Sequence, residues 1–426
     1  MQFTGGVSVS GINDSGTPRS RRALAAIGAA VVLGWTGAAV QAQTAPAPPP
    51  APAPPAPAPA MPDWLSRIQF SGSIETYYDF NTNSPNVVLP DGSSAQLNQL
   101  QNFNFHSNQF SVPLAELVAQ ETPDPVKSPL GFKLVLAFGD ATDWIHGSAP
   151  AEQSYKNILQ AYATYIANGK SKAPITVNLG KFVTYNGYEV IESQNNFNYS
   201  HGLLFSWAIP YYHTGISVSR PFGSKFTLTG YLVNGWNNVV DNNNGKTVGY
   251  TVNWTPSPKF SFVNQGTFGP ENAGDEHDYR ELSDNILTYT PNSKWTWVLN
   301  YDYGHDKPGG KNVKWQGVAG YAHYMINDKS AGTVRAELFN DHDGFTIGAP
   351  GAGPAELAAG TVLNSGTPQE VKEVTLTYEY RFHPRVITRF EVREDWSTAD
   401  AFAKGTTATP NSKTQTQFII GNIFTF

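Results

Sequence analysis

Hydrophobic and polar positions alternate with a period of two through most of the chain from Ile68 onward. Successive side chains of a strand point to opposite faces, so this pattern predicts strands. About sixteen such segments follow one another, and each sets an apolar face with aromatic ends against a polar or small face that carries charge. The clearest example is segment 295–303, whose apolar face consists of Trp295, Trp297, Leu299, Tyr301 and Tyr303.

The final segment, 414–426, follows the same rule and ends on an aromatic residue, Phe426. In a closed membrane barrel the last strand pairs with the first, and its outward rings lie at the lipid interface. We therefore expect Phe424 and Phe426 to form the assembly signal that the barrel-insertion machinery reads. Taken alone, this segment is equally compatible with an edge strand of a soluble β-protein.

The connections between these segments alternate between long and short. Alternation cannot say which face is inside, but long loops at one end and tight turns at the other are typical of an outer-membrane barrel. Segments of about ten residues also suit tilted strands that cross a bilayer. We predict an all-β, transmembrane antiparallel β-barrel of about 16 strands, with fourteen or eighteen as alternatives, short periplasmic turns and long extracellular loops. Pro113 marks an expected bulge, because Phe110 is out of phase with Leu117.

Composition agrees with this prediction and excludes several functions. Glycine (39), phenylalanine (24) and tyrosine (20) are abundant, which is typical of β-proteins. The absence of cysteine excludes a disulfide scaffold and any cysteine-based metal site or nucleophile. A net charge of −6 argues against nucleic acid as a partner.

The N-terminal region has the features of an export signal. Arg19, Arg21 and Arg22 precede the apolar run 23–35, and small residues near Ala42 offer a cleavage site. We expect residues 1–42 to be a signal peptide, residues 43–65 an Ala/Pro-rich periplasmic linker, and residues 66–426 the barrel. Ser20 with the two following arginines resembles part of a twin-arginine signal. The general secretory route is favoured, since a barrel must stay unfolded until it inserts.

Several blocks of sequence resemble the β-barrel porins of the OmpL-like type from Gram-negative outer membranes. The main block comprises residues 180–184, 188–192, 196–200 and 209–215, and residues 336–341 and 391–397 are similar to later landmarks of the group. The resemblance runs from about residue 70 to residue 426 and implies a closed barrel in the cell outer membrane. It implies passive diffusion of small hydrophilic solutes and ions through a water-filled channel, with outer-membrane lipid as a partner and a homo-oligomer left open.

The candidate site is the third long connection, 184–210, which is rich in Tyr, Asn and Glu and ends in the apolar stretch 203–210. We expect it to fold into the lumen and narrow the pore. Opposed acidic and basic rows would then create a transverse field that favours small polar solutes. The alternative is a lid over the mouth, with wall charges that satisfy one another. The expected constriction residues are Tyr185, Glu189, Glu192, Asn195, Asn196 and His201, and the expected wall residues are Glu75, Lys133, Arg335, Glu337, Arg389, Glu391 and Arg393.

Metal and enzyme functions are less well supported. The His and carboxylate groups at 275–278, 305–306 and 341–343 lack zinc or calcium spacing, so we expect solvated loop charge and no cofactor, with loop calcium left open. An outer-membrane hydrolase would need His and Ser or Asp on an outer strand face. His323 and Ser330 are near in sequence, but there is no nucleophile elbow. A non-conducting receptor or adhesin barrel remains the main alternative to a porin.

Overall fold

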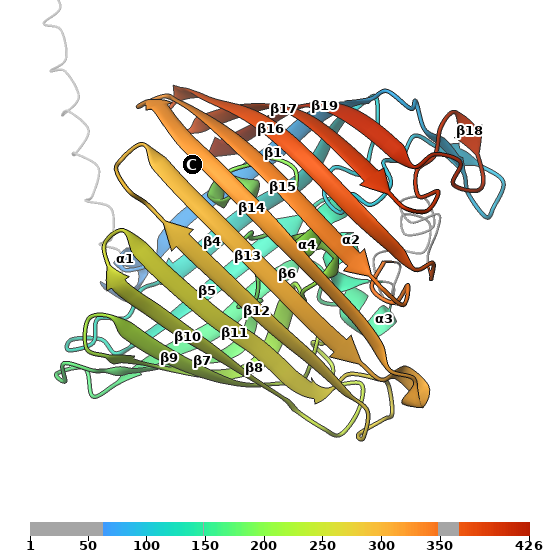
Figure 1. Cartoon of the computed structure of the whole chain (residues 1–426). Coiled ribbons are helices and arrows are strands. Elements are labelled where there is room, and N and C mark those ends of the chain that lie inside the picture. The colour runs from blue at the N-terminus through green and yellow to red at the C-terminus, as the bar shows by residue number, and fades with distance from the viewer. Residues whose placement is uncertain (1–62, 148, 348–365) are drawn as a thin grey trace, which may run out of the picture. The chain divides into compact units, whose positions relative to one another are not determined.

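The computed structural model describes residues 63–147, 149–347 and 366–426. Within these residues, sixteen antiparallel strands form one closed barrel in which chain neighbours are also spatial neighbours (Figure 1). This confirms the predicted fold class and strand number. The expected signal peptide and nearly all of the linker lie outside the described residues.

The barrel strands are β1 (Gln69–Asn81), β4 (Phe110–Glu121), β5 (Leu130–Phe138), β6 (Ile158–Ala167), β7 (Ile175–Val183), β8 (Tyr212–Phe222), β9 (Phe226–Val233), β10 (Thr247–Ser257), β11 (Phe260–Pro270), β12 (Tyr279–Tyr289), β13 (Trp295–Asp306), β14 (Val313–Asn327), β15 (Ser330–Asp341), β16 (Gln369–His383), β17 (Val386–Ser397) and β19 (Thr414–Thr425). Three short strands form a separate small sheet: β2 (Asn86–Val88), β3 (Ser94–Ala95) and β18 (Thr406–Thr407). The helical segments are α1 (Asp63–Ser66), α2 (Asp140–His146), α3 (Pro150–Gln153), α4 (Leu203–Trp207), η1 (Ser193–Asn195) and η2 (Pro308–Gly310).

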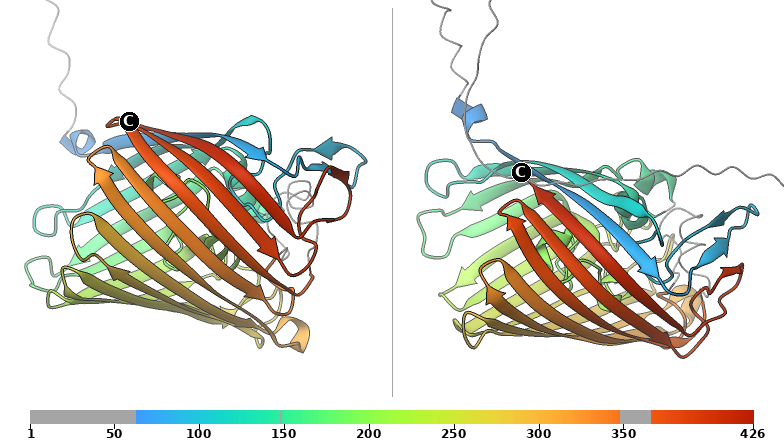
Figure 2. Two further views of the ribbon diagram at one scale, coloured as in Figure 1. Left: turned by 45° about the horizontal axis from the view of Figure 1, so that its top comes forward. Right: turned by 90° about the horizontal axis from the view of Figure 1, so that it is seen from above.

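The first and last barrel strands close the ring. β1 pairs with β19 from Ser73 opposite Thr425 to Asn81 opposite Gln417. Beyond this ladder, the backbones of Gly72 and Phe426 exchange two hydrogen bonds of 3.0 and 3.1 Å. Closure removes the unpaired edge that an open sheet would expose. Helix α1 and the C-terminus lie at the end of the barrel that carries the tight turns (Figure 2).

The barrel is apolar on its outer face and polar inside. Phe70, Leu179 and Phe382 are 71%, 63% and 63% exposed on the outer face, whereas inward charged residues such as Arg335 and Glu391 are buried. This is the reverse of a soluble barrel and suits lipid outside and water within. No helix in the described part of the chain is long and apolar enough to cross a membrane.

The bulge expected at Pro113 is present. Glu75 of β1 pairs with Leu114, but Tyr77, two residues further on, pairs with Ser111, so β4 carries one additional residue at this point. Proline can occupy such a position because a bulged residue lies outside the regular ladder of hydrogen bonds. The extra residue restores the phase between the two halves of the strand.

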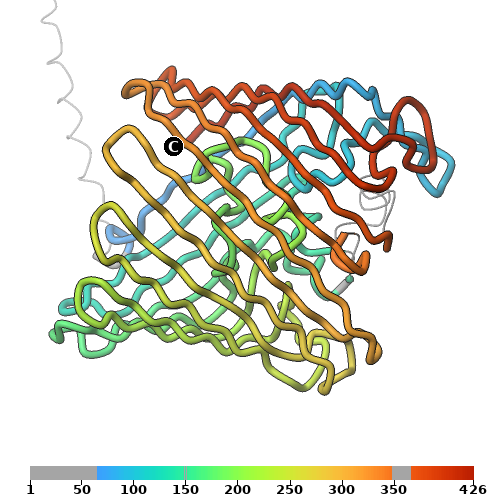
Figure 3. The backbone as a smooth tube through the Cα atoms, in the orientation of Figure 1, coloured from blue at the N-terminus to red at the C-terminus, as the bar shows by residue number. Residues whose placement is uncertain are grey.

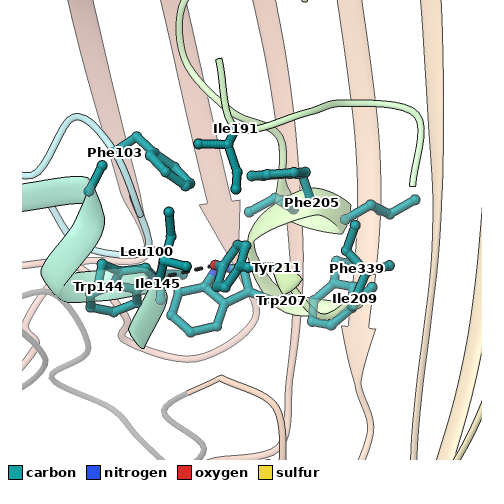
Figure 4. Close-up of a cluster of buried hydrophobic side chains, with 14 of the residues drawn as sticks. Leu100, Phe103, Trp144, Ile145, Ile191, Phe205, Trp207, Ile209, Tyr211 and Phe339 are labelled. Carbon is teal, nitrogen blue, oxygen red and sulfur yellow. Dashed lines mark hydrogen bonds between the residues drawn. The ribbon is translucent and has the colours of Figure 1, made fainter. Parts of the chain in front are cut away.

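Long connections contribute to a single apolar core inside the barrel: L1 (82–109), L2 (139–157), L3 (184–211), the described part of L7 (342–368) and L8 (398–413). Figure 4 shows its centre, where Trp144 of α2 meets Trp207 of α4 with ring centroids 6.0 Å apart. The indole Nε1 of Trp144 donates to the Tyr211 hydroxyl at 3.2 Å. Each fully buried aromatic contributes about 1.5–3 kcal/mol of transfer free energy, so this core can hold the loops inward. The backbone trace shows L3, in green, crossing the interior (Figure 3).

Candidate functional site

L3 lies inside the barrel and is bonded to several strands. The backbone N–H of Gly187 donates to Asp284 on β12, and that of Tyr188 donates to Asn300 Oδ1 on β13 at 3.1 Å. Further along, the N–H of Ser193 donates to Glu75 Oε1 on β1 at 2.8 Å. L3 therefore follows the β12–β17 wall to the barrel seam rather than extending into solvent.

Besides Asp284, three wall carboxylates accept backbone N–H groups of L3. Glu75 accepts two hydrogen bonds from Ser193, one from the backbone N–H and one from the hydroxyl. Glu391 on β17 accepts hydrogen bonds from the backbone N–H groups of Tyr199 and Ser200. Glu337 on β15 accepts those of Leu203 and Leu204 at the start of α4. Charge-assisted bonds of this kind are stronger than neutral ones, and they fix the loop by its backbone.

Three wall guanidinium groups donate to L3 carbonyl oxygens. Arg335 donates to Ser200 at 2.6 Å, and Arg393 donates to His201 at 2.7 Å. Arg389 donates to three carbonyls, those of Ser193, Asn196 and Asn198, at 2.6–2.7 Å. The arginines also pair with strand carboxylates, with Glu373 2.7 Å from Arg335 and Glu379 2.9 Å from Arg389.

These contacts explain why charged residues occupy the inner face of β15–β17. L3 has little regular structure, so its buried N–H and C=O groups need partners from elsewhere. Carboxylates supply acceptors and arginines supply donors, and each set also neutralises the other. A Cβ at Gly202 would lie 2.2 Å from Glu337 Oε1, so a larger residue there would displace the carboxylate that accepts from Leu203 and Leu204.

The structure brings Glu189 together with the wall instead of placing it across the lumen. Its Oε1 lies 2.8 Å from Nη1 of Arg335, and its Oε2 accepts the N–H of Gly202 at 2.7 Å. The expected acidic and basic residues thus meet as hydrogen-bonded pairs rather than as rows facing one another over a gap. A transverse field acts on a solute only where an acidic row and a basic row face each other across water. Glu189 and Arg335 do not form such an arrangement.

His201 and Asn196 lie within the fold of L3 itself. His201 Nε2 is 2.9 Å from the carbonyl oxygen of Val190, and Asn196 Nδ2 donates to the same carbonyl at 2.7 Å. Both side chains are buried. Burial lowers the pKa of His201 although Glu189 nearby raises it, so the neutral ring with a proton on Nε2 is favoured.

The remaining predicted residues are more accessible. Asn195 is exposed, and Glu192, Tyr185 and the wall residue Lys133 are half-buried. The ring of Tyr185 stacks on Tyr231 of β9 with centroids 3.7 Å apart.

Sequence reasoning missed several anchors of L3. Glu373 and Glu379 pair with the arginines, while Asp284 and Asn300 hold the start of the loop. All four alternate in phase with the polar face of their strands, so the period-two pattern could have placed them inside. Nothing in that pattern indicates which loop they bind.

The His and carboxylate groups of the outer loops cap turns. Asp275 Oδ1 accepts the N–H of His277 at 2.8 Å, and Asp341 accepts those of Phe345 and Ile347 at 2.8 and 2.9 Å. The described residues contain no group of three or more His, Asp or Glu side chains that could hold a metal ion.

Solved structures similar to this chain are outer-membrane barrels. An anion-selective porin from Comamonas acidovorans has 12% identity and a TM-score of 0.51, over 84% of this chain and 99% of that one. OprB of Pseudomonas putida has 10% identity and a TM-score of 0.52, over 85% and 95%. OmpT of Vibrio cholerae has 12% identity and a TM-score of 0.50, over 84% and 97%. At these identities the likeness is one of fold. No curated protein sequence matches the chain.

A closed barrel with an apolar outer face and a loop folded into a polar interior defines a porin of the outer membrane. The chain belongs to the family described as "Putative beta-barrel porin-2, OmpL-like", whose model matches residues 67–426. The protein is accordingly an outer-membrane channel for passive diffusion of small hydrophilic solutes and ions.

Proposed function

We propose that L3 is the constriction of this channel and that solutes pass between its free face and the inner wall formed by β6–β11. The observation that carries this proposal is the anchoring of L3 backbone groups by Glu75, Glu337, Glu391, Arg335, Arg389 and Arg393. A loop fixed to one wall by charged side chains narrows the lumen on that side and leaves the other side to the solute.

The depth of these contacts supports a constriction over a lid. Glu75 lies in the middle of β1 (Gln69–Asn81). Thr377 lies in the middle of β16 (Gln369–His383), and its hydroxyl accepts a hydrogen bond of 2.6 Å from Asn198 Nδ2. A lid over the mouth would form its hydrogen bonds with residues at the ends of the strands. L3 therefore reaches about midway along the strands that it contacts.

The channel acts without catalysis in this proposal. The hydrolase alternative needs a histidine on an outer strand face, but His323 stacks on Phe197 of L3 with centroids 4.1 Å apart and an angle of 3°. Its Nδ1 lies 2.9 Å from the Thr333 hydroxyl. The side chain is thus held within the barrel, away from lipid.

Two partners complete the proposal. The insertion machinery would recognise the last strand, and a homo-oligomer would place part of the apolar outer face against further copies. The channel function is tested by adding the purified protein to a planar bilayer. Discrete conductance steps are expected. Their absence, with β-type circular dichroism and a heat-modifiable gel shift intact, would favour the non-conducting receptor or adhesin.

A further inference from the structure

Charge is distributed unequally around the inside of the barrel. The strands β6–β11, all fully described, contain only two lysine, arginine or carboxylate residues, Lys181 and Arg220. Arg220 is exposed and lies over the ring of Phe222 on the outer face. Lys181 is buried, and its ammonium donates to the carbonyl of Ile158 at 2.6 Å. This half of the interior therefore presents no charge to the lumen.

The charged half of the interior is largely occupied by L3. The arginines Arg335, Arg389 and Arg393 are at most 1% exposed, and Glu75, Glu337 and Glu391 at most 5%. Their charged atoms bond to the loop, and Arg389 and Arg393 also pair with the strand carboxylates Glu379 and Asp395. A passing ion meets these groups only through the loop that covers them.

The uncharged wall is lined by hydroxyl and amide groups. Thr164 donates to Asn178 Oδ1 at 2.8 Å, and Asn178 donates to the Ser217 hydroxyl at 3.1 Å. On the neighbouring strands, the hydroxyl of Thr229 donates to that of Ser219 at 3.0 Å. These groups can donate hydrogen bonds to a hydroxylated solute and accept them from it. Because none of them is charged, the solute can bind without removing water from an ionised side chain.

Aromatic rings lie among these polar groups. Phe182 contacts Tyr162 edge-on at 6.5 Å and Tyr231 at 6.2 Å, and Tyr185 of L3 stacks on Tyr231. Tyr162, Tyr185 and Tyr231 are half-buried, so their rings remain partly accessible. Gly249 makes room for this stack, because a Cβ there would lie 1.7 Å from the Tyr185 hydroxyl.

Phe197 of L3 forms a second aromatic group, on the side of the loop that packs against β14. Phe197 is half-buried between His323 and Tyr188, with centroids 4.1 and 6.0 Å away. The amide residues Gln194 and Asn195 precede it in the chain. Aromatic faces next to neutral hydrogen-bonding groups suit a solute with both an apolar ring face and hydroxyl groups.

We infer that the lumen is adapted to neutral, ring-shaped polyhydroxy solutes, of which monosaccharides are the simplest, with little preference between anions and cations. The inference rests on the proposed constriction, because L3 must both cover the charged wall and supply part of the aromatic lining. It assigns the solute path to β6–β11 and the specificity to uncharged side chains.

Two measurements on the full-length protein test this inference. Proteoliposome swelling should be faster in isosmotic D-glucose than in mannitol, an acyclic polyol of similar size, and Tyr162→Ala should reduce that difference. In a bilayer with a KCl gradient, the reversal potential should correspond to a K⁺/Cl⁻ permeability ratio within about twofold of unity. The variants Thr229→Glu and Thr229→Lys should shift this ratio in opposite directions, by roughly threefold to fivefold each.

Arg220→Glu is the matched control, because Arg220 belongs to the neighbouring strand β8 but lies on the outer face. It should leave the ratio unchanged. Equal swelling in glucose and mannitol, or strong ion selectivity that the two Thr229 variants leave unaltered, would overturn the inference while the channel itself stands. Absence of both swelling and conductance in a folded barrel would instead overturn the channel.

Discussion

Arg335 on β15 and Glu189 in L3 form a fully buried ion pair, with Nη1 and Oε1 2.8 Å apart and side chains 0% and 2% exposed. The same guanidinium also holds Glu373 and the carbonyl of Ser200. This one side chain thus joins two strands of the barrel to the loop that narrows it.

The first prediction concerns this pair. Arg335→Met should release L3, because it leaves two carboxylates buried without their cation, at a cost of about 3–5 kcal/mol. The barrel should still form, since strand hydrogen bonds and the outer apolar band stabilise it. We expect frequent fluctuations in single-channel current and faster proteolysis within 184–211. Arg220→Met, on the outer face, is the control. Steady current and unchanged proteolysis of the Arg335 variant would contradict the anchoring role.

The second prediction is a dependence on pH through His201. Burial lowers the pKa of His201 below its ordinary value of 6.5. The unfolded loop therefore binds the proton more readily, so the free energy that holds L3 in place falls as pH drops below about 6.5. Besides Glu189, the groups near the ring are Arg335, Phe103 and Phe205.

Current fluctuations should accordingly become more frequent between pH 7.5 and pH 5. His201→Gln keeps a donor toward the Val190 carbonyl but cannot titrate, so this variant should lose the trend in that range. If the variant and the parent protein respond identically to pH, another group controls the loop.

Glu192 allows a third prediction. It is the L3 carboxylate that remains half-buried, whereas Glu189 is paired with Arg335. Glu192→Gln should shift permeability toward anions by roughly twofold to fivefold, as expected for removal of one charge beside an aqueous path. Reversal potentials in a salt gradient measure the shift. Glu276→Gln, in an exposed position of the loop after β11, should have little effect. A shift toward cations in the Glu192 variant would be incompatible with its proposed position.

The sequence contains enough information to predict the barrel. Alternation shows which residues share a face, as for Trp297 and Leu299, and the rhythm of loop lengths separates the two ends. The bulge at Pro113 is also predictable, because a phase change requires one additional residue. Local periodicity suffices for these features because each depends on neighbouring positions in the chain.

The contacts of L3 could not be predicted in the same way. Arg389 and Glu391 are recognisable as inward residues, but their partners, Asn196 and Ser200, are almost two hundred positions away. The apolar stretch at 203–210 predicts that these residues are buried, but it does not predict which other residues cover them. Long-range pairing between a loop and a wall leaves no periodic signal in either segment.

Assembly provides the fourth prediction. Phe426 pairs with Gly72 across the seam, and its ring covers that glycine, since a Cβ at Gly72 would lie 2.5 Å from the Phe426 Cζ. Phe426→Asp should lower the amount of heat-modifiable protein in the outer membrane, because it places a charge on the closing strand. Phe222→Asp, on an exposed ring at the end of β8, is the control. Wild-type levels of the Phe426 variant would argue against the last strand as the assembly signal.

The fifth prediction tests the constriction most directly, through single-channel conductance of a variant that lacks residues 184–210. Val183 and Tyr212 are paired at the ends of β7 and β8, so a short Asn-Gly-containing turn can join the strands without moving them. If L3 constricts the pore, the deletion should raise conductance severalfold while the heat-modifiable gel shift is preserved. Unchanged conductance in a folded variant would place the narrowest point elsewhere and contradict the account.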